Sequence, residues 1–570
     1  MKVRSNRVGI LTGILPLAVV ALFATFHVKT GAAQKASHTT YYTHGRIYTN
    51  DPTQPWAEAM AVSEGKISCI GKMDHVLLDC GGSDEGAETV NLKGQFVMPG
   101  FNDAHVHLGM AAEDALAVPL VGVPSPEEMV KRVADAVAHH KPGEWITGGG
   151  WDHTTWPEKR FPNRQQLDAV APKNPVILTH VSGHVAVANS AALKSAEIDK
   201  NTPNPPGGEI EHDSLGELTG MLKEDAAMSL VKVRIPDPSP GQRRHGIELV
   251  LENIAKNGVT SVQDNSEWAN FQVYKQLKDE NKLTVRITEW LPFSASLNEL
   301  QDMRAQGGST DPWLKTGALK AVTDGALGSR TAAMLEPYSD DPSSTGILTL
   351  DPEKLRVMAI ERDKAGFQLN FHAIGDRANR IALDVFEAVA KANGHRDRRD
   401  RIEHAQVVEP MDFVRFAELK VIASMQPSHQ TTDMRWAEDR IGPVRIKGAY
   451  AWSTMLKNGV RLAFGTDYSV EVISPFRGLY ACVTRERPDG GPRNGWEPQE
   501  KISLDDCIRA YTSGSAYAQF EEGKKGELKD GEYADFIILS NDLTKVPPAQ
   551  FTKTRVLRTV VGGRTVHMVN

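Results

Sequence analysis

The sequence predicts an α/β protein: a TIM (β/α)8 barrel with a small β-sandwich domain from both chain ends and an inserted subdomain after strand 1. Three observations predict it. Eight apolar strand candidates alternate with helical segments, both chain ends carry strand-and-turn patterns, and a long segment separates the first two barrel strands. Alternating strands and helices favour a parallel sheet, and eight such units favour a barrel. The 570 residues suffice for two or three domains.

The two ends of the chain share one pattern. Glu64-Gly65-Lys66 and Gly562-Gly563 are turn signals next to strand candidates. Because chain ends often lie close together, residues 38–98 and 524–570 are predicted to form one composite β-sandwich domain. The strand candidates are Arg46–Tyr48, Ala59–Val62, Ile67–Ile70, Ala534–Leu539 and Val556–Val561.

The barrel is expected within residues 99–523. Helical segments such as 351–364 and 377–392 separate several of its strands. The interval between the first two strands is too long for one loop, so an insertion of about 112–255 is predicted over the C-terminal face of the barrel. The strand candidates are Phe96–His107, Gly258–Asp264, Leu283–Leu291, Gly317–Asp324, Phe367–His372, Arg401–His404, Val421–Gln426 and Arg461–Asp467.

The N-terminus has the pattern of a targeting segment. Three basic residues precede an uncharged, largely apolar run over residues 8–26, and small residues follow at 30–34. Residues 1–33 are therefore predicted to be a secretory signal peptide, with an uncleaved membrane anchor as the alternative. We expect an exported protein, periplasmic or secreted, whose mature body does not enter a membrane.

The four cysteines form no Cys-x-x-Cys pair, which argues against a structural zinc knot. Export permits disulfides, and the spacing of Cys69 and Cys80 allows one; four buried free thiols are the alternative. None of the four has an obvious histidine partner, so a thiol nucleophile is not expected.

The formal net charge is −7, without a long basic run, and this argues against nucleic-acid binding. The expected partner is a small-molecule substrate. We also expect a homodimer, although no motif in the sequence bears on the oligomeric state.

The first barrel strand ends with His105 and His107, two residues apart. Residues at this spacing face the same side of a strand, and paired imidazoles suit zinc and related metals. Alone, such a pair is more often an incidental strand end than a metal site.

Four later strands also carry metal-capable side chains where they reach the top of the barrel. These are Lys320, His372, His404 and Asp467. Catalysis in barrels of this type takes place at the carboxyl ends of the strands. The repetition predicts a functional site at that end.

Motifs along nearly the whole mature chain resemble the amidohydrolase superfamily, and within it the YtcJ-like branch (amidohydrolase family 3). They include VMPGFNDAHVHL, SGHVAVANSAAL, LKAVTDGALGSRTA, HAIGDRAN, RIEHAQ, MQPSH, AFGTDYSV and GELKDGEYADFIIL. Together these segments are specific, whereas each alone is not.

The resemblance implies a divalent metal, with zinc expected and one or two ions. It implies that His105, His107 and Asp467 hold the first ion and that His372 and His404 hold the second. Lys320 would bridge them after carboxylation, which needs the neutral amine that desolvation and cationic neighbours favour.

The expected reaction is hydrolysis of an amide or formamide-like C–N bond by metal-activated hydroxide, with Asp467 as the catalytic proton acceptor and donor. Ester or lactone hydrolysis is an alternative, because the same hydroxide attacks those carbonyls. Deamination is another, but related deaminases carry a glutamate three residues after the strand-five histidine, where this chain has Gly375. A retired hydrolase fold that only binds ligands is the non-enzymatic alternative.

Four further residues are candidates for substrate contact. His184 lies in the SGH motif of the insertion, and Trp151 and Asp152 follow three glycines that could shape a pocket wall. Arg330 has two interpretations, pairing with a substrate carboxylate or with a structural acid.

Overall fold

The computed structural model describes residues 39–80 and 87–569. The predicted signal peptide or anchor, residues 1–33, lies outside these ranges. Among the described residues, no helix combines the length and the apolar character that crossing a bilayer requires.

Eight parallel strands form the central sheet, in the order β21-β20-β19-β18-β17-β16-β15-β8. The strands occur where the sequence predicts them, with one correction: residues 96–107 form two strands, because the chain changes sheets at Gly100. β7 (Phe96–Pro99) pairs with the small domain, and only β8 (Phe101–Val106) enters the barrel. The other barrel strands are β15 (Val259–Asp264), β16 (Arg286–Pro292), β17 (Leu314–Val322), β18 (Leu369–Ala373), β19 (Arg401–His404), β20 (Ile422–Met425) and β21 (Leu462–Phe464).

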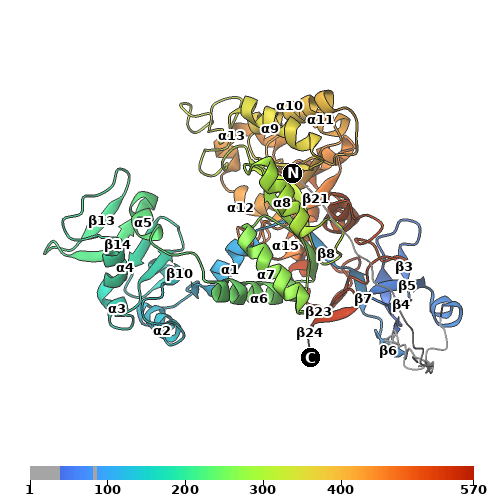
Figure 1. Ribbon diagram of the computed structural model, residues 1–570, viewed down its shortest axis with the longest axis horizontal. Helices are drawn as coiled ribbons and strands as arrows, with labels where there is room; N and C mark the ends of the chain where they lie inside the picture. Colours follow the sequence, from blue (N-terminus) through green and yellow to red (C-terminus); the bar gives the residue numbers. More distant parts are fainter. Residues whose placement is uncertain (1–38, 81–86, 570) are drawn as a thin grey trace, which may run out of the picture. The chain divides into compact units, whose positions relative to one another are not determined.

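Helices alternate with these strands along the chain, and α7 to α11 are labelled in Figure 1. Their starts follow local capping chemistry: the Asp351 carboxylate accepts a hydrogen bond from Lys354 N at the start of α9, and Ser239 and Gln242 form a capping box on α6. The helices are α1 (Leu108–Leu116), α6 (Pro240–Lys256), α7 (Trp268–Asp279), α8 (Leu297–Gly307), α9 (Pro352–Lys364), α10 (Asp376–Asn393), α11 (Asp412–Glu418), α12 (Pro427–Asp433), α13 (Ala437–Arg445), α14 (Trp452–Lys457), α15 (Pro475–Thr484), α16 (Leu504–Arg509) and α17 (Ser515–Tyr517).

The first and last barrel strands are joined by side-chain contacts near their carboxyl ends. The buried Asp103 carboxylate accepts hydrogen bonds from Thr466 N at 2.8 Å and Thr466 Oγ1 at 2.6 Å. A Cβ at Gly465 would lie 2.6 Å from His105 N, so only glycine allows this approach. The contact brings residue 467 next to residue 105, and this is the position on which the candidate site depends.

The small domain contains strands from both chain ends. One sheet has the order β24-β23-β22-β7-β2-β3 and the other β5-β4-β1-β6. Tyr42 and Met60 from one sheet share a buried core with Ile47, Val97 and Phe536 from the other, which confirms the predicted sandwich. The strands are β1 (Thr40–Thr43), β2 (Arg46–Tyr48), β3 (Trp56–Ala57), β4 (Ala59–Ser63), β5 (Lys66–Gly71), β6 (Glu88–Asn91), β22 (Phe536–Leu539), β23 (Val556–Val561) and β24 (Arg564–Met568).

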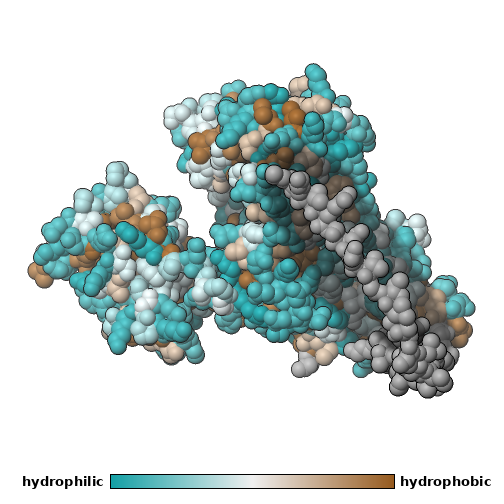
Figure 2. Space-filling model, in the orientation of Figure 1, coloured by the Kyte–Doolittle hydropathy of each residue, from teal (hydrophilic) through white to brown (hydrophobic). Residues whose placement is uncertain are grey.

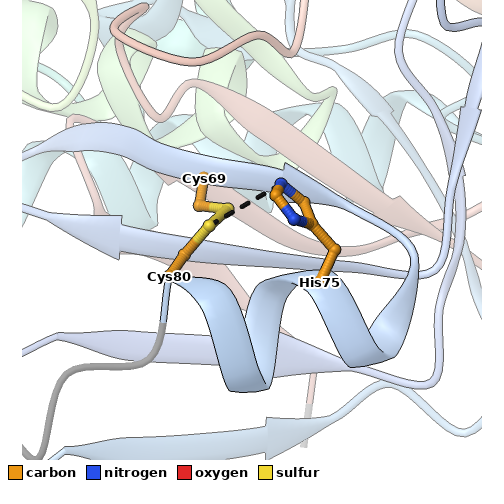
Figure 3. Close-up of side chains that lie close together, drawn as sticks. All are labelled: Cys69, His75 and Cys80. Carbon is orange, nitrogen blue, oxygen red and sulfur yellow. Dashed lines mark hydrogen bonds between the residues drawn. A yellow bond between two sulfur atoms is a disulfide. The ribbon is translucent and has the colours of Figure 1, made fainter.

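A disulfide joins Cys69 on β5 to Cys80, so these two cysteines follow the disulfide alternative. His75 lies beside it, with Nε2 at 3.7 Å from Cys80 Sγ (Figure 3). Cys482 and Cys507 are buried free thiols.

The insertion after the first barrel strand contains a sheet of its own, in the order β13-β14-β12-β11-β10-β9. Its helices and two buried clusters complete an inserted subdomain, as predicted. α6 contributes Ile247, Val250 and Ile254 to the barrel core. The elements are β9 (Val118–Pro119), α2 (Pro126–Val137), β10 (Ile146–Trp151), α3 (Arg164–Asp168), β11 (Val176–His180), β12 (Val185–Ala188), α4 (Ser190–Ser195), β13 (Glu209–His212), β14 (Leu218–Lys223) and α5 (Glu224–Lys232).

The face drawn in Figure 2 is mostly hydrophilic, with hydrophobic residues in separate small groups. Small, scattered apolar groups of this kind are normal on the surface of a folded protein.

Candidate metal centre

His105 and His107 lie at the carboxyl end of β8, with ring centroids 5.1 Å apart. Glu403 Oε2 lies 2.8 Å from Nδ1 of the fully buried His105, and the backbone carbonyl of Asn265 lies 3.1 Å from Nδ1 of His107. Acceptors at both Nδ1 atoms favour the tautomer in which Nε2 has a free lone pair. The lone pairs of the two Nε2 atoms are thus available to bind a cation.

Asp467 faces both imidazoles. Its Oδ1 lies 3.0 Å from His107 Nε2 and 3.7 Å from His105 Nε2. The residue follows β21 with a left-handed backbone (φ 58°), and its N–H donates to His105 O at 2.8 Å. Aspartate tolerates this backbone region better than most residues. The first three predicted ligands therefore lie together.

Lys320 projects from β17 into the same cluster. Its Nζ lies 3.3 Å from His105 Nε2 and 5.2 Å from the centre of the Trp290 ring. Burial lowers the pKa of Lys320 to about 8. Burial and then the Lys320 charge lower the pKa of His105 to about 4, so the imidazole is neutral near pH 7.

His372 and His404 complete the predicted set. Their ring centroids are 4.5 Å apart, and the His404 ring lies 5.2 Å from that of His105. Burial, with a smaller effect of Lys320, lowers the pKa of His372 to about 3. His372 Nε2 lies 3.4 Å from Asp324 Oδ1. All six predicted metal-site residues are thus brought together from five strand ends.

The structure adds His429, which was not among the predicted ligands. Its Nε2 lies 3.6 Å from Asp467 Oδ2. His429 is in α12, which starts two residues after β20 ends, at the same end of the barrel. The motif MQPSH contained the residue, but a histidine inside a helix lacks the strand-end position that marked the other ligands.

Two overlapping groups therefore share one carboxylate: His105, His107 and Asp467, and His404, His429 and Asp467. In each group the candidate ligand atoms lie within 4.8 Å of one another. Both groups consist of imidazole and carboxylate donors, which suit first-row divalent metals.

Unpaired polar atoms provide a test of whether this cluster fits a metal. Among the described residues, the buried Asp467 Oδ1 and His429 Nε2 have no hydrogen-bond partner. A buried acceptor without a partner costs folding free energy, and a divalent cation bound between these atoms removes that cost. The residues present therefore fit a divalent metal.

Glu403 and Arg401 form a support beneath the cluster that was also not predicted. Arg401 is fully buried and donates from Nε to Glu403 Oε1 at 2.6 Å. Burial alone would raise the pKa of Glu403, but the Arg401 charge, with smaller effects of His105 and Lys320, holds this pKa at about 2. Glu403 is therefore an ionised acceptor for His105 Nδ1.

The four predicted substrate contacts do not join this cluster. Trp151 is fully buried, and its Nε1 donates to Leu178 O, so it is a core residue of the insertion rather than a pocket wall. Arg330 donates to both carboxylate oxygens of Asp340, at 3.0 and 2.9 Å, which is the structural-acid alternative.

His184 and Asp152 also have partners of their own in the insertion. The His184 side chain is 70% exposed, and its Nδ1 lies 2.9 Å from Glu224 Oε2. Asp152 Oδ1 accepts hydrogen bonds from Thr154. Contacts within the insertion therefore account for the positions of the His184 and Asp152 side chains.

Comparison with known proteins supports the fold and identifies the family. The model of the amidohydrolase family (Amidohydro_3) matches residues 88–567. A solved structure, an uncharacterised metal-dependent hydrolase from Pyrococcus furiosus, has a TM-score of 0.73 and 30% sequence identity, covering 90% of this chain and 100% of that chain.

Three relatives cover most of the chain. Protein LONG AFTER FAR-RED 3 of Arabidopsis thaliana is 37% identical over 92% of this chain and 91% of its own length. YtcJ of Bacillus subtilis (strain 168), named as an amidohydrolase, is 31% identical over 92% and 98%. The N-substituted formamide deformylase of Arthrobacter pascens is 29% identical over 91% and 96%.

Proposed function

Because the chain belongs to the amidohydrolase family and is a metal-dependent hydrolase, we propose that it cleaves the C–N bond of an amide or formamide-like small molecule. The observation that carries the proposal is the position of Asp467. Its carboxylate lies against His105, His107 and His429 at the carboxyl end of the barrel, where it can serve both a metal and a proton.

The chain's residues perform three tasks in this proposal. His105, His107, Lys320, His372, His404 and Asp467 hold one or two divalent ions, with zinc as the proposed metal and His429 as an added ligand candidate. A bound ion supplies Lewis acidity toward a carbonyl oxygen and lowers the pKa of water. Glu403 orients His105, and Asp467 accepts a proton at Oδ2 and delivers it to the leaving amine.

The proposed bond type rests on a relative and on one position in the barrel. The relative from Arthrobacter pascens is named for deformylation of N-substituted formamides. Deamination is disfavoured because a Cβ at Gly375 would lie 2.0 Å from Ala333 O, leaving no space for the glutamate of related deaminases. Ester and lactone hydrolysis use the same attack on a carbonyl and are separated from amide hydrolysis by the substrate screen below.

The screen uses protein freed of metal by a chelator and reloaded with zinc, manganese or iron. N-formyl amines, N-acyl amines, cyclic amides, esters and lactones are offered separately, and released amine and acid are measured. We expect turnover of N-formyl or N-acyl amines that disappears on chelation and returns with one of the metals. Turnover confined to esters or lactones would contradict the proposed bond.

A retired scaffold is tested by metal content. Such a protein has no reason to retain a complete ligand set, so we expect stoichiometric divalent metal in the purified protein. Protein that takes up no metal from any of the three solutions would favour the scaffold instead.

We further propose a small-molecule substrate, no nucleic-acid partner, export through the N-terminal segment, and homodimer formation as a secondary possibility. N-terminal sequencing of protein from the medium or periplasm tests whether the first 33 residues are removed on export. We expect cleavage near residue 33. Protein retained in the cytoplasm at full length would contradict export.

A further inference from the structure

A second group of metal-capable side chains lies in the insertion and shares no residue with the barrel centre. Asp152, His153 and His180 each offer one ligand atom, and these atoms lie within 4.8 Å of one another. We propose that these three residues form a separate binding site for a divalent cation of the zinc type.

The distances suit a small tetrahedral ion. His153 Nδ1 lies 3.3 Å from His180 Nε2, and Asp152 Oδ1 lies 3.7 Å from the same Nε2. With metal–ligand bonds of about 2.0–2.1 Å, neighbouring ligands of a tetrahedral zinc ion are about 3.3 Å apart. The two nitrogens are at that separation already, and Asp152 Oδ1 lies about 0.4 Å farther from His180 Nε2 than that.

The backbone determines this arrangement. β10 and β11 are adjacent parallel strands, with Trp151 paired to His180 at their ends, and Asp152 and His153 follow directly. A register shift at Gly150, whose φ is +93°, occurs just before the site. Glycine adopts this conformation without steric cost. The three side chains thus come from the carboxyl ends of two neighbouring strands rather than from flexible surface segments.

Aromatic packing restricts both imidazoles. The fully buried Trp151 ring contacts His180 edge to face, with centroids 4.6 Å apart, and Phe161 lies 4.1 Å from the His153 ring centre. His180 Nδ1 lies 2.8 Å from Ser182 Oγ and accepts a hydrogen bond from Ser182 N at 3.1 Å. This contact fixes the orientation of the ring, so that Nε2 faces His153 and Asp152.

The charge states of these groups suit a cation. Burial, and then the neighbouring His153, lower the pKa of His180, so this imidazole is neutral near pH 7. Hydrogen bonds from Thr154 lower the pKa of Asp152, so its carboxylate is ionised. Two imidazole nitrogens and one carboxylate oxygen leave a fourth position for water, as zinc sites with three protein ligands do.

The site joins the segment after β10 to the end of β11. Asp152 and His153 start the segment after β10, and His180 is the last residue of β11. A cation bound to the folded form alone stabilises that form, so zinc is expected to raise the unfolding temperature of the insertion. This role is independent of the reaction in the barrel.

The test compares zinc stoichiometry between single variants of the full chain. Metal is removed with a chelator, zinc alone is returned at micromolar free concentration, and bound zinc is measured by mass spectrometry. We expect His180→Ala and His153→Ala to bind one zinc ion fewer than the parent protein. His212→Ala is the matched control, since this exposed histidine on β13 lies in the same subdomain with Nε2 against Lys200 O.

A hydrogen bond between two neutral imidazoles would give the same 3.3 Å separation without any metal. In that case the parent and all three variants bind equal zinc, and the proposal is overturned. A difference that appears only at millimolar zinc overturns it as well, because weak surface binding explains it.

A second measurement uses the unaltered protein, so that a folding defect in a variant cannot decide the result. Diethyl pyrocarbonate modifies accessible imidazoles, and mass spectrometry locates each modified histidine. Zinc is expected to slow modification of both His153 and His180, because a ring nitrogen bound to zinc has no lone pair left to attack the reagent. The rate at His212 stays unchanged. Equal rates with and without zinc at all three histidines refute the site.

Discussion

Glu403 Oε2 lies 2.8 Å from His105 Nδ1, although the two residues come from opposite parts of the barrel sequence. Glu403 precedes the predicted ligand His404 by one residue, so β19 provides an orienting acceptor and a ligand candidate in succession. The contact leaves His105 Nε2 facing Lys320 and Asp467. Correct placement of β19 therefore affects two histidines of the centre.

Replacing this carboxylate tests its orienting role. Glu403→Gln keeps the size of the side chain but removes the charge that fixes the His105 tautomer. We expect metal affinity to fall about 10–100-fold, as for other partners behind a metal-bound histidine. Competition with a coloured chelator measures it. Glu353→Gln, exposed on α9, is the control, and an unchanged affinity in Glu403→Gln would refute the assignment.

Asp467→Asn tests proton transfer. The amide retains the shape of the side chain, but it cannot accept the proton of water, so kcat should fall about 10²–10⁴-fold. The unfolding temperature should change little, and metal content is measured on the same sample to separate lost chemistry from lost metal. Asp384→Asn, on the exposed face of α10, is the control. Activity within about tenfold of the parent would exclude Asp467 as the proton acceptor.

Lys320 is proposed to carry a carboxyl group from carbon dioxide. With its pKa at about 8, roughly a tenth of the amine is neutral at pH 7, against well under a hundredth for a free lysine. Metal-loaded protein in ¹³C-bicarbonate should show a carbamate carbon resonance that Lys320→Arg lacks.

Lys315 provides a closely matched control for that experiment. It lies on the same strand, and burial lowers its pKa to about 8 as well, but its Nζ is paired with Glu521 Oε1 at 2.7 Å. Lys315→Arg should retain the carbamate resonance. If Lys315→Arg lost the resonance and Lys320→Arg kept it, the modified residue would be Lys315, and the assignment to Lys320 would be wrong.

Asp400 predicts a pH dependence of stability outside the metal centre. Burial raises the pKa of this carboxyl to about 7, even though its Oδ1 accepts a hydrogen bond from Leu369 N. Between about pH 4 and 7 the folded state holds a proton that the unfolded state has lost, so rising pH destabilises the fold. The stabilisation of the folded state by protonated Asp400 is fully present below about pH 4 and is lost as the pH rises through about 7.

Urea unfolding of Asp400→Asn and the parent at several pH values measures this effect. The asparagine cannot ionise, so the parent should lose stability relative to the variant by up to about 1.4 kcal/mol for each pH unit in that interval. A constant difference between the two proteins from pH 4.5 to 7.5 would contradict the raised pKa.

The strand-end positions explain why most of the centre could be predicted. His105, Lys320, His404 and Asp467 lie where apolar segments end, and in a parallel barrel all carboxyl ends meet at one face. His429 was missed because it lies within a helix after β20, where no periodicity distinguishes a ligand from a surface histidine. Glu403 was missed because an acid next to a histidine has many structural explanations.

The predicted substrate contacts stay predictions, and the structure shows other partners for them. Trp151 and Arg330 were chosen for neighbouring glycines and residue type, and His184 from the family resemblance, and each has a local partner in the fold. Pairing with Asp340 or Glu224 depends on loop positions that the sequence pattern does not encode. Conversely, the proximity of His153 to His180 arises from the register of β10 and β11 and has no signature along the chain.

The sequence by itself predicted the barrel, the composite β-domain, the insertion and six candidate ligands that the structure brings together, because alternating apolar segments and their terminal side chains report directly on strand number and direction. Only the tertiary structure decided the rest. The approach of β21 to β8 through Asp103 and Thr466 brings Asp467 to His105, and the alignment of β19 places Glu403 behind that imidazole. Such contacts depend on distances between segments far apart in the chain, which local patterns cannot specify.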